Sequence, residues 1–186
     1  MKRLAILVVL VSVLTGCGGL RGMRTVPAGQ TVNTTPPPGK VAVVFMRPQA
    51  PGHTASVFEV KKDTNVFVGH VLTGTKVLYI TDPGTTRFLV SGQGGDLMDA
   101  QLEAGRTYYV LVAPGFSSAY SLRPVTKADN ASFRNWFNAC GWIEMGEEPQ
   151  RWARQHAQQI EARRQAITPK WEAKPDRPTL RAGDYR

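Results

Sequence analysis

Residues 40–130 contain a series of short apolar runs separated by turn residues, and this pattern limits the folds that the chain can adopt. Val41–Met46 is apolar at successive positions, as expected for a central strand of a packed sheet. Later runs meet across polar connections at 61–65, 82–84 and 103–105, whose composition is typical of turns. No helical pattern separates the runs. The sequence therefore predicts a mainly β fold, an antiparallel β-sandwich of about seven strands.

The residues after this sandwich have a different pattern. Ser132 can cap a short helix that ends near Ala139, and the stretch from Glu147 to about Ile167 predicts a longer helix. The apolar stripe of this longer helix is narrow, so we expect it to pack lightly on the sandwich. Residues 169–186 contain several prolines and basic side chains and predict an irregular basic tail.

The first 17 residues have the pattern of an export signal. Lys2 and Arg3 precede an apolar run from Leu4 to Leu14, which is too short to span a bilayer that needs about 20 apolar residues. The run ends in Leu-Thr-Gly-Cys, which resembles the lipobox of bacterial lipoproteins. The resemblance implies that residues 1–16 are removed and that Cys17 carries fatty acyl chains such as palmitate. The alternative is an ordinary signal peptide with a chance cysteine at its boundary.

Acylation of Cys17 would hold the protein stably, since two or more acyl chains give lasting attachment to a membrane. Gly18 and Gly19 follow the cysteine, and the resemblance to lipoproteins without an acid at this place implies the periplasmic face of the outer membrane. Residues 18–39 are rich in glycine and proline and predict a tether that lets the folded domain stand clear of the membrane.

These patterns divide the chain into five segments. They are a signal peptide at 1–16, the lipidated cysteine and tether at 17–39, the β-sandwich at 40–130, a helical extension at 131–168 and the basic tail at 169–186.

The net charge of +9 is concentrated outside the sandwich. Basic segments on both sides of a nearly neutral domain suit contact with a membrane through acylated Cys17, with peptidoglycan, with anionic lipid or with another envelope protein. Nucleic acid is not expected as a partner, because the signal exports the chain and no basic stripe with interleaved aromatic residues is present.

Three segments carry a resemblance to a known type of domain. They are Lys40–Pro48, the Asp82–Gly84 turn with the strand that follows it, and Ala104–Tyr109. Their order resembles an uncharacterised family of bacterial lipoprotein domains that is similar to PEGA-type and carboxypeptidase-regulatory-like β-sandwiches. The resemblance implies a small exported sandwich and brings no catalytic residue or ligand.

No motif in the chain predicts catalysis. Ser117 lies in Gly115–Ala119, which lacks the final glycine of a hydrolase nucleophile elbow. Cys140 has no intramolecular disulfide partner if Cys17 is acylated, and is expected to be a small buried apolar side chain. We therefore expect no catalytic residue. The alternative is a cryptic envelope hydrolase or polymer-processing enzyme, which would need Ser117 or Cys140 close to His156.

We also expect no metal and no cofactor. His53, His70 and His156 are scattered and no pair of them has ligand spacing. The acids between Asp96 and Glu103 lack the alternating ligands of a calcium loop, and the glycine-rich loop at 91–95 does not precede a helix that could bind phosphate.

The expected function is a non-enzymatic binding or scaffolding module of the cell envelope. Aromatic and basic side chains recur at binding hot spots, and they gather in the helical extension. The residues that form a candidate partner surface are Trp142, Trp152, Arg151, Arg154, Arg163 and Arg164.

Overall fold

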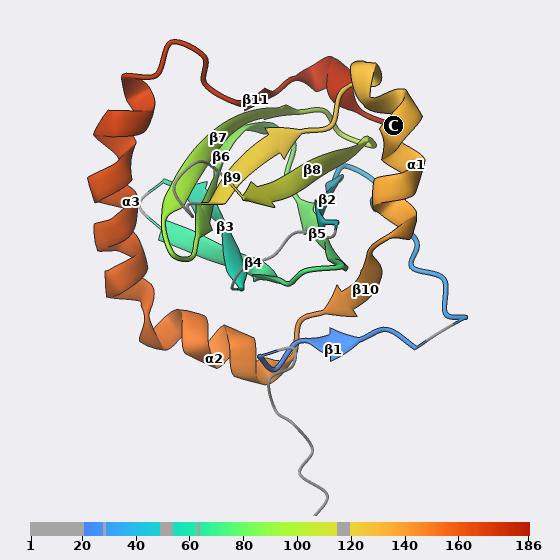
Figure 1. Ribbon diagram of the computed structural model, residues 1–186, viewed down its shortest axis with the longest axis horizontal. Helices are drawn as coiled ribbons and strands as arrows, with labels where there is room; N and C mark the ends of the chain where they lie inside the picture. The colour runs from blue at the N-terminus through green and yellow to red at the C-terminus, as the bar shows by residue number, and fades with distance from the viewer. Residues whose placement is uncertain (1–20, 28, 49–53, 63, 115–119) are drawn as a thin grey trace, which may run out of the picture.

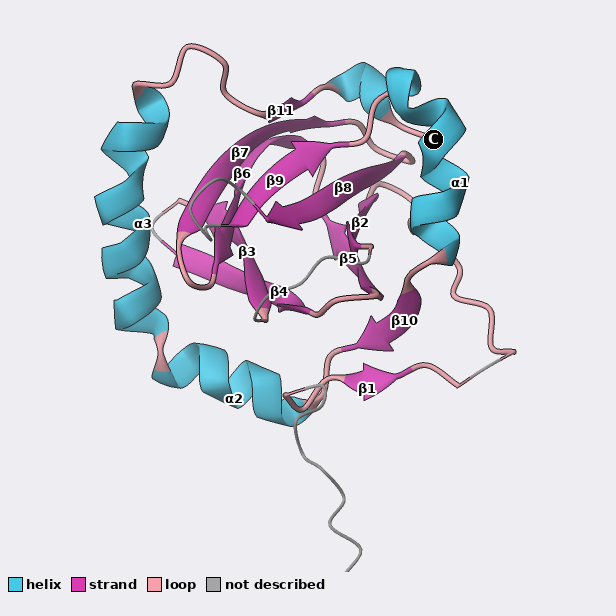
Figure 2. Ribbon diagram, viewed as in Figure 1, coloured by secondary structure: helices cyan, strands magenta, loops and turns pink. Residues whose placement is uncertain are grey.

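The computed structural model describes residues 21–27, 29–48, 54–62, 64–114 and 120–186. Strands make up 43% of the structure and helices 26%, so the expectation of a mainly β fold is confirmed. Figure 1 and Figure 2 show two sheets packed face to face, with the C-terminal third of the chain circling them.

The first sheet has six strands and the second has five. The first sheet, in spatial order, is β1 (Arg24–Thr25), β10 (Gly141–Glu144), β5 (Thr75–Thr81), β2 (Val41–Arg47), β8 (Thr107–Pro114) and β9 (Tyr120–Pro124). The second sheet is β11 (Thr179–Leu180), β7 (Gly95–Leu102), β6 (Gly84–Ser91), β3 (Ala55–Lys61) and β4 (Thr64–Val71). Every run expected between residues 40 and 125 forms one of the strands β2 to β9.

The prediction of a simple antiparallel sandwich of about seven strands is wrong. The described residues form 11 strands in two mixed sheets, and β2–β8, β10–β5 and β11–β7 are parallel pairs. The chain leaves the first sheet after β5, forms β6 and β7 in the second, and returns to place β8 beside β2. Apolar alternation indicates that a strand exists but does not indicate which strand pairs with it.

The core lies between the two sheets and is continuous. Phe45 of β2 meets Phe88 of β6 edge to face, with ring centroids 5.1 Å apart. Alternate residues of β2, including Val44 and Met46, point away from this core and pack under α1 (Asn130–Asn138). β2 is therefore buried on both faces, which explains its unbroken apolar sequence.

The helical extension covers the sandwich rather than packing lightly on it. α2 (Glu147–Gln155) and α3 (Ala157–Glu172) lie on the outer face of the second sheet, where Ile160 and Trp171 are buried against Phe58, Leu89 and Leu97. The single helix expected from Glu147 to Ile167 is thus two helices. The two helices lie along different directions in Figure 1, so the chain can follow the sheet.

The segment expected to be an irregular basic tail is packed as well. Leu180 is fully buried in the core beside β7. The Tyr108 hydroxyl donates to the Ala182 carbonyl over 3.0 Å, and the Arg186 amide donates to the Thr107 carbonyl over 2.9 Å. These contacts join the end of the chain to β8, because Tyr108 and Thr107 both belong to that strand.

The described part of the expected tether also belongs to the domain. β1 pairs with β10, and Met23 enters the core with 3% of its surface exposed. A Cβ atom at Gly22 would lie 2.8 Å from the Cβ of Glu148, so the chain passes close to the start of α2. Glycine and proline predict little regular structure, but they do not prevent an irregular segment from packing.

Trp171→Ala tests whether the C-terminal segment is part of the folding unit. The side chain is 1% exposed and its ring lies under the Arg87 guanidinium at 4.4 Å, so removing it leaves a large cavity. We expect the free energy of unfolding, measured with urea, to fall by about 3–5 kcal/mol. The neighbouring exposed Lys170→Ala is the control and should change it by less than about 0.5 kcal/mol. Equal, small effects would show that the segment is not part of the cooperative unit.

Candidate functional site

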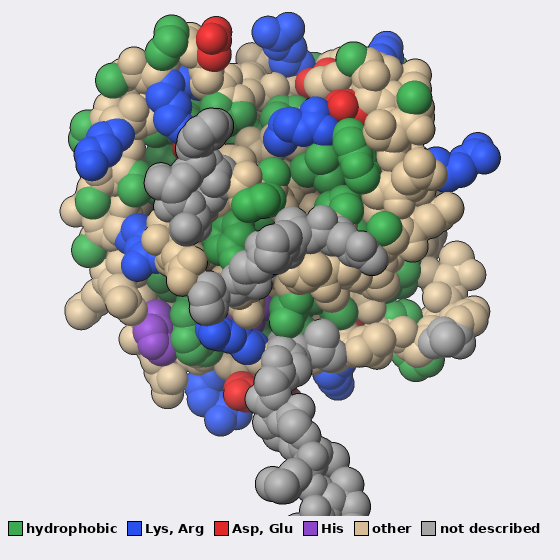
Figure 3. All heavy atoms as spheres, viewed as in Figure 1, with side chains coloured by type: hydrophobic (Ala, Val, Ile, Leu, Met, Phe, Trp, Pro, Cys, Tyr) green, Lys and Arg blue, Asp and Glu red, His purple; other side chains and the backbone are tan. Residues whose placement is uncertain are grey.

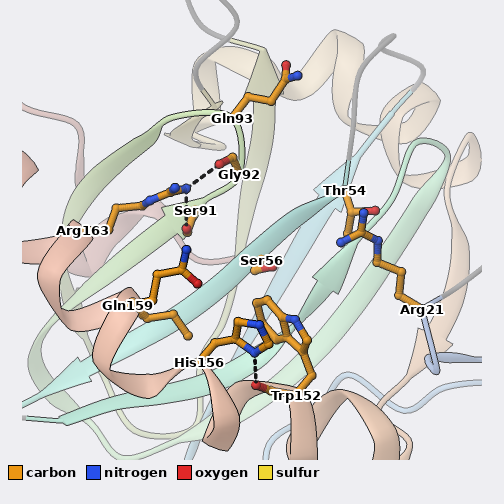
Figure 4. Close-up of a pocket in the computed structure, with 11 residues that line it drawn as sticks. Arg21, Thr54, Ser56, Ser91, Gly92, Gln93, Trp152, His156, Gln159 and Arg163 are labelled. Atoms are coloured by element: carbon orange, nitrogen blue, oxygen red, sulfur yellow. Dashed lines mark hydrogen bonds between the residues drawn. The ribbon is translucent and has the colours of Figure 1, made fainter.

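A recess of about 310 Å³ opens over the outer face of the second sheet, beside the junction of α2 and α3 (Figure 4). Its walls come from four parts of the chain: Arg21 near the N-terminus, Thr54 before β3, the Gly92–Gln93 turn after β6, and the two helices. The helices contribute Trp152, His156, Gln159, Ile160 and Arg163. The recess lies beside the apolar cluster that packs under α3 on this sheet face.

Three polar residues on neighbouring strands form a row at this end of the sheet. Ser91 of β6 and His70 of β4 are both register partners of Ser56 on β3. The Ser56 Oγ lies 2.9 Å from the His70 Nδ1, and Ser91 and Ser56 line the recess. One pair further along the sheet the outward positions are Phe58 and Leu89, which pack under α3. The row therefore marks the point where the apolar cover ends.

His70 is held as a neutral ring. Only 1% of it is exposed, and the rings of Phe67 and Trp152 lie against it at 5.1 and 4.8 Å. Burial lowers the pKa of His70 to about 4, and the positive charge of Arg21 adds to this effect. The imidazole is therefore uncharged near neutral pH, and one of its nitrogens is a hydrogen-bond partner for Ser56.

His156 ends α2 and precedes α3, and it fixes Trp152 at the edge of the recess. Its Nδ1 donates to the Trp152 carbonyl over 2.8 Å, and its ring stacks on the indole at a centroid distance of 4.7 Å. With one indole face covered by His156 and another ring contact to His70, Trp152 serves as a wall. It does not offer an open platform for stacking a ligand.

Arg163 and Arg21 make the recess positively charged. The Arg163 Nη1 donates to the Ser91 Oγ over 3.2 Å and to the Gly92 carbonyl, so its guanidinium is fixed against the turn after β6. Arg21 is exposed, with a positive backbone φ of 46°. Among the described residues that line the recess, no carboxylate offsets these two charges. The arrangement favours an anion.

The candidate partner surface is divided by the fold. Trp152 and Arg163 line the recess together, and Arg151 and Arg154 are exposed on α2 nearby. The other two members lie elsewhere or are engaged. Arg164 donates to Glu161 over 2.5 Å, and Trp142 lies on the first sheet beside Phe137, with its ring 4.8 Å from the Lys76 ammonium.

Cys140 and His156 do not form the nucleophile–base pair that a hydrolase would need. Cys140 is 3% exposed between the first sheet and α1, and burial raises the pKa of its thiol to about 11. His156 lies over the second sheet, so Cys140 and His156 are on opposite sides of the sandwich. Ser117 and His53, like Cys17, lie outside the described residues.

The structure instead brings together Ser56 and His70, a pair that sequence reasoning missed. Only the antiparallel register of β3 and β4 places them opposite each other, and no local motif indicates that register. A carboxylate that would orient His70 is not in contact with it among the described residues. Glu59, three positions along β3, is 1% exposed and bonded to Tyr79 at 2.6 Å and Thr81 at 2.9 Å on the other sheet, so it faces the interior.

Within the described residues, no three histidine, cysteine, aspartate or glutamate side chains are grouped closely enough to hold a metal ion. None of the helices in this part of the chain is long and apolar enough to cross a membrane. No protein-family model, no curated protein and no solved structure matches the chain.

The low pKa of His70 predicts a dependence of stability on pH. Between the ordinary value of 6.5 and about 4, the unfolded chain binds a proton at this ring that the folded chain does not. The free energy of unfolding should therefore be fully retained above this window and fall as the pH drops through it, by at most about 3 kcal/mol. Urea unfolding at a series of pH values measures the change.

The matched variant is His70→Gln, which retains a polar group for Ser56 but does not titrate. We expect its free energy of unfolding to vary less than that of the unmodified protein between about pH 6.5 and 4. If both proteins lose the same stability across this range, the buried ring is not the cause.

Proposed function

We propose that this chain is a bacterial lipoprotein, anchored through acylated Cys17, that acts as a non-enzymatic binding module in the cell envelope. The likeness to PEGA-type lipoprotein domains and a place on the periplasmic face of the outer membrane belong to the same proposal. The observation that carries the binding role is the recess, where Arg21 and Arg163 lie on opposite sides of a space lined also by serine and glutamine side chains.

The chemistry of the recess favours binding over catalysis. A hydrolytic site needs an accessible nucleophile and a general base whose pKa lies near the working pH. Ser56 is 7% exposed, and a His70 pKa of about 4 makes this ring a weak base. Two guanidinium groups, of which that of Arg163 is held by hydrogen bonds, are by contrast suited to hold an anion without further chemistry.

The packing of the N-terminal segment supports a domain that lies close to the proposed anchor. The first residue that the structure describes is Arg21, and four peptide steps separate it from Cys17. A chain extends by at most about 3.6 Å per residue, so Arg21 lies within about 14 Å of an acylated Cys17. If Cys17 is acylated, the packing of Met23 and β1 into the fold leaves no long tether between the domain and the membrane.

Cys17→Ser tests the anchor. In bacterial cells the unmodified protein should fractionate with the membranes and its N-terminal peptide should carry the mass of acyl chains. The variant should lose both properties, because serine provides no thiol for acylation. Cys140→Ala is the matched control and should stay with the membranes, since Cys140 is buried in the fold. A bare Cys17 in the native protein would contradict the proposal.

The second candidate function, an envelope hydrolase, has one observation in its favour. The Ser56 Oγ is 2.9 Å from a nitrogen of a neutral histidine, at the recess. A fluorophosphonate probe, which labels activated serines, distinguishes the two functions. We expect no labelling above that of the Ser56→Ala variant. Labelling that is lost in Ser56→Ala would favour the hydrolase and contradict the binding module.

A further inference from the structure

The cations of the recess come from separate parts of the chain and approach one space. Arg163 belongs to α3 and Arg21 precedes β1, and Figure 4 shows them on opposite sides of the recess. Ser91 and Gln159 lie on the Arg163 side of the recess and add a hydroxyl and an amide, and Thr54 lies beside Arg21. Glu148 packs against Gly22 but does not line this space. The local field therefore favours a negatively charged group.

Arg163 is fixed in place before any ligand arrives. Its two hydrogen bonds, to the Ser91 Oγ and the Gly92 carbonyl, both use Nη1. The described residues contain no hydrogen-bond partner for the other nitrogens of this guanidinium. A held guanidinium loses little side-chain entropy on binding, and its fork of donors matches the oxygens of a phosphate.

The position of Arg21 relates the recess to the membrane. With Arg21 within about 14 Å of Cys17, this wall of the recess is confined to the neighbourhood of the bilayer surface whenever Cys17 is acylated. Figure 3 shows basic side chains, with an acidic one among them, at the corner of the molecule where α2 and β1 meet. Arg151 and Arg154 on α2 are exposed, as are Glu147 and Glu148 at its start. Cations at a membrane surface meet the phosphates of anionic lipids.

We infer that the recess binds the phosphate of an anionic phospholipid headgroup in the membrane that holds the protein. This rests on the anchoring proposed above, which supplies the closeness to lipid. The volume of about 310 Å³ is at the small end of ligand sites, which suits a phosphate with its glycerol and not a large polymer. Binding would fix the orientation of the domain on the bilayer, because anchor and recess would then be two separate points of attachment.

The experiment uses the mature chain, residues 17–186, carrying Cys17→Ser so that no acyl chain contributes. It is mixed with vesicles of phosphatidylcholine alone and with vesicles of phosphatidylcholine and phosphatidylglycerol in equal parts, and the bound fraction is measured by sedimentation. We expect binding to the anionic vesicles only. Arg21→Gln and Arg163→Gln should each weaken the apparent affinity about fivefold, the effect of about one charge at a membrane surface.

Arg134→Gln is the matched control. It removes the same charge from an exposed position on α1, which covers the other sheet, and should leave binding unchanged. If Arg134→Gln weakens binding as much as Arg163→Gln, the overall positive charge of the protein explains the binding to vesicles, and the inference fails. Arg21 is exposed, so its variant keeps the test valid even if Arg163→Gln impairs folding.

Binding of inorganic phosphate and of glycerol phosphate, measured in solution, tests whether the recess takes a lipid headgroup or a soluble anion. Saturable binding of either one that depends on Arg163, with no binding to anionic vesicles, would overturn the headgroup assignment in favour of a soluble phosphate ligand. Because the protein in this experiment carries no acyl chain, its result does not depend on whether Cys17 is modified in cells. Failure of the recess and failure of the anchor are therefore distinguished.

Discussion

Both sheets of this protein are apolar on both faces, and the rest of the structure depends on covering the two outer ones. Phe58, Leu89 and Leu97 face away from the central core and would be exposed in an isolated sandwich. α3 covers them with Ile160 and Trp171, and α1 covers the first sheet in the same way with Phe133, Trp136 and Phe137. The sheets therefore need the C-terminal segment that circles them in Figure 1 to cover their outer faces. Burial of apolar surface in turn holds this segment in place.

Some elements of this fold can be predicted from the sequence and others cannot. The strands β2 to β9 can be predicted, because their apolar runs and turn residues are local signals. The parallel pairing of β2 with β8 cannot, since it depends on residues more than 60 positions apart, from Val43 to Tyr108. The break at His156 between α2 and α3 has no proline or glycine to indicate it. β1 and β11 are each 2 residues long and are stable only because a partner strand is present.

The candidate site was harder to predict than the fold, for the same reason. Trp152 and Arg163 stand out in the sequence, and both line the recess. Ser56, Ser91 and His70 are ordinary strand residues until the register places them in one row. Arg21 lies in a segment whose composition predicts a tether, so its position beside α2 depends on the packing of Met23 and Gly22. The charge of the recess is a property of the assembled fold.

The contact between Arg186 and Thr107 also bears on when the molecule can fold. Synthesis proceeds from the N-terminus, so Trp171, which covers the outer face of the second sheet, and Leu180, which enters the core between the sheets, are made after the strands that they cover. Until they emerge, a growing chain has strands but lacks the surface that shields them. The two sheets can therefore complete their packing only after the C-terminal segment has been made.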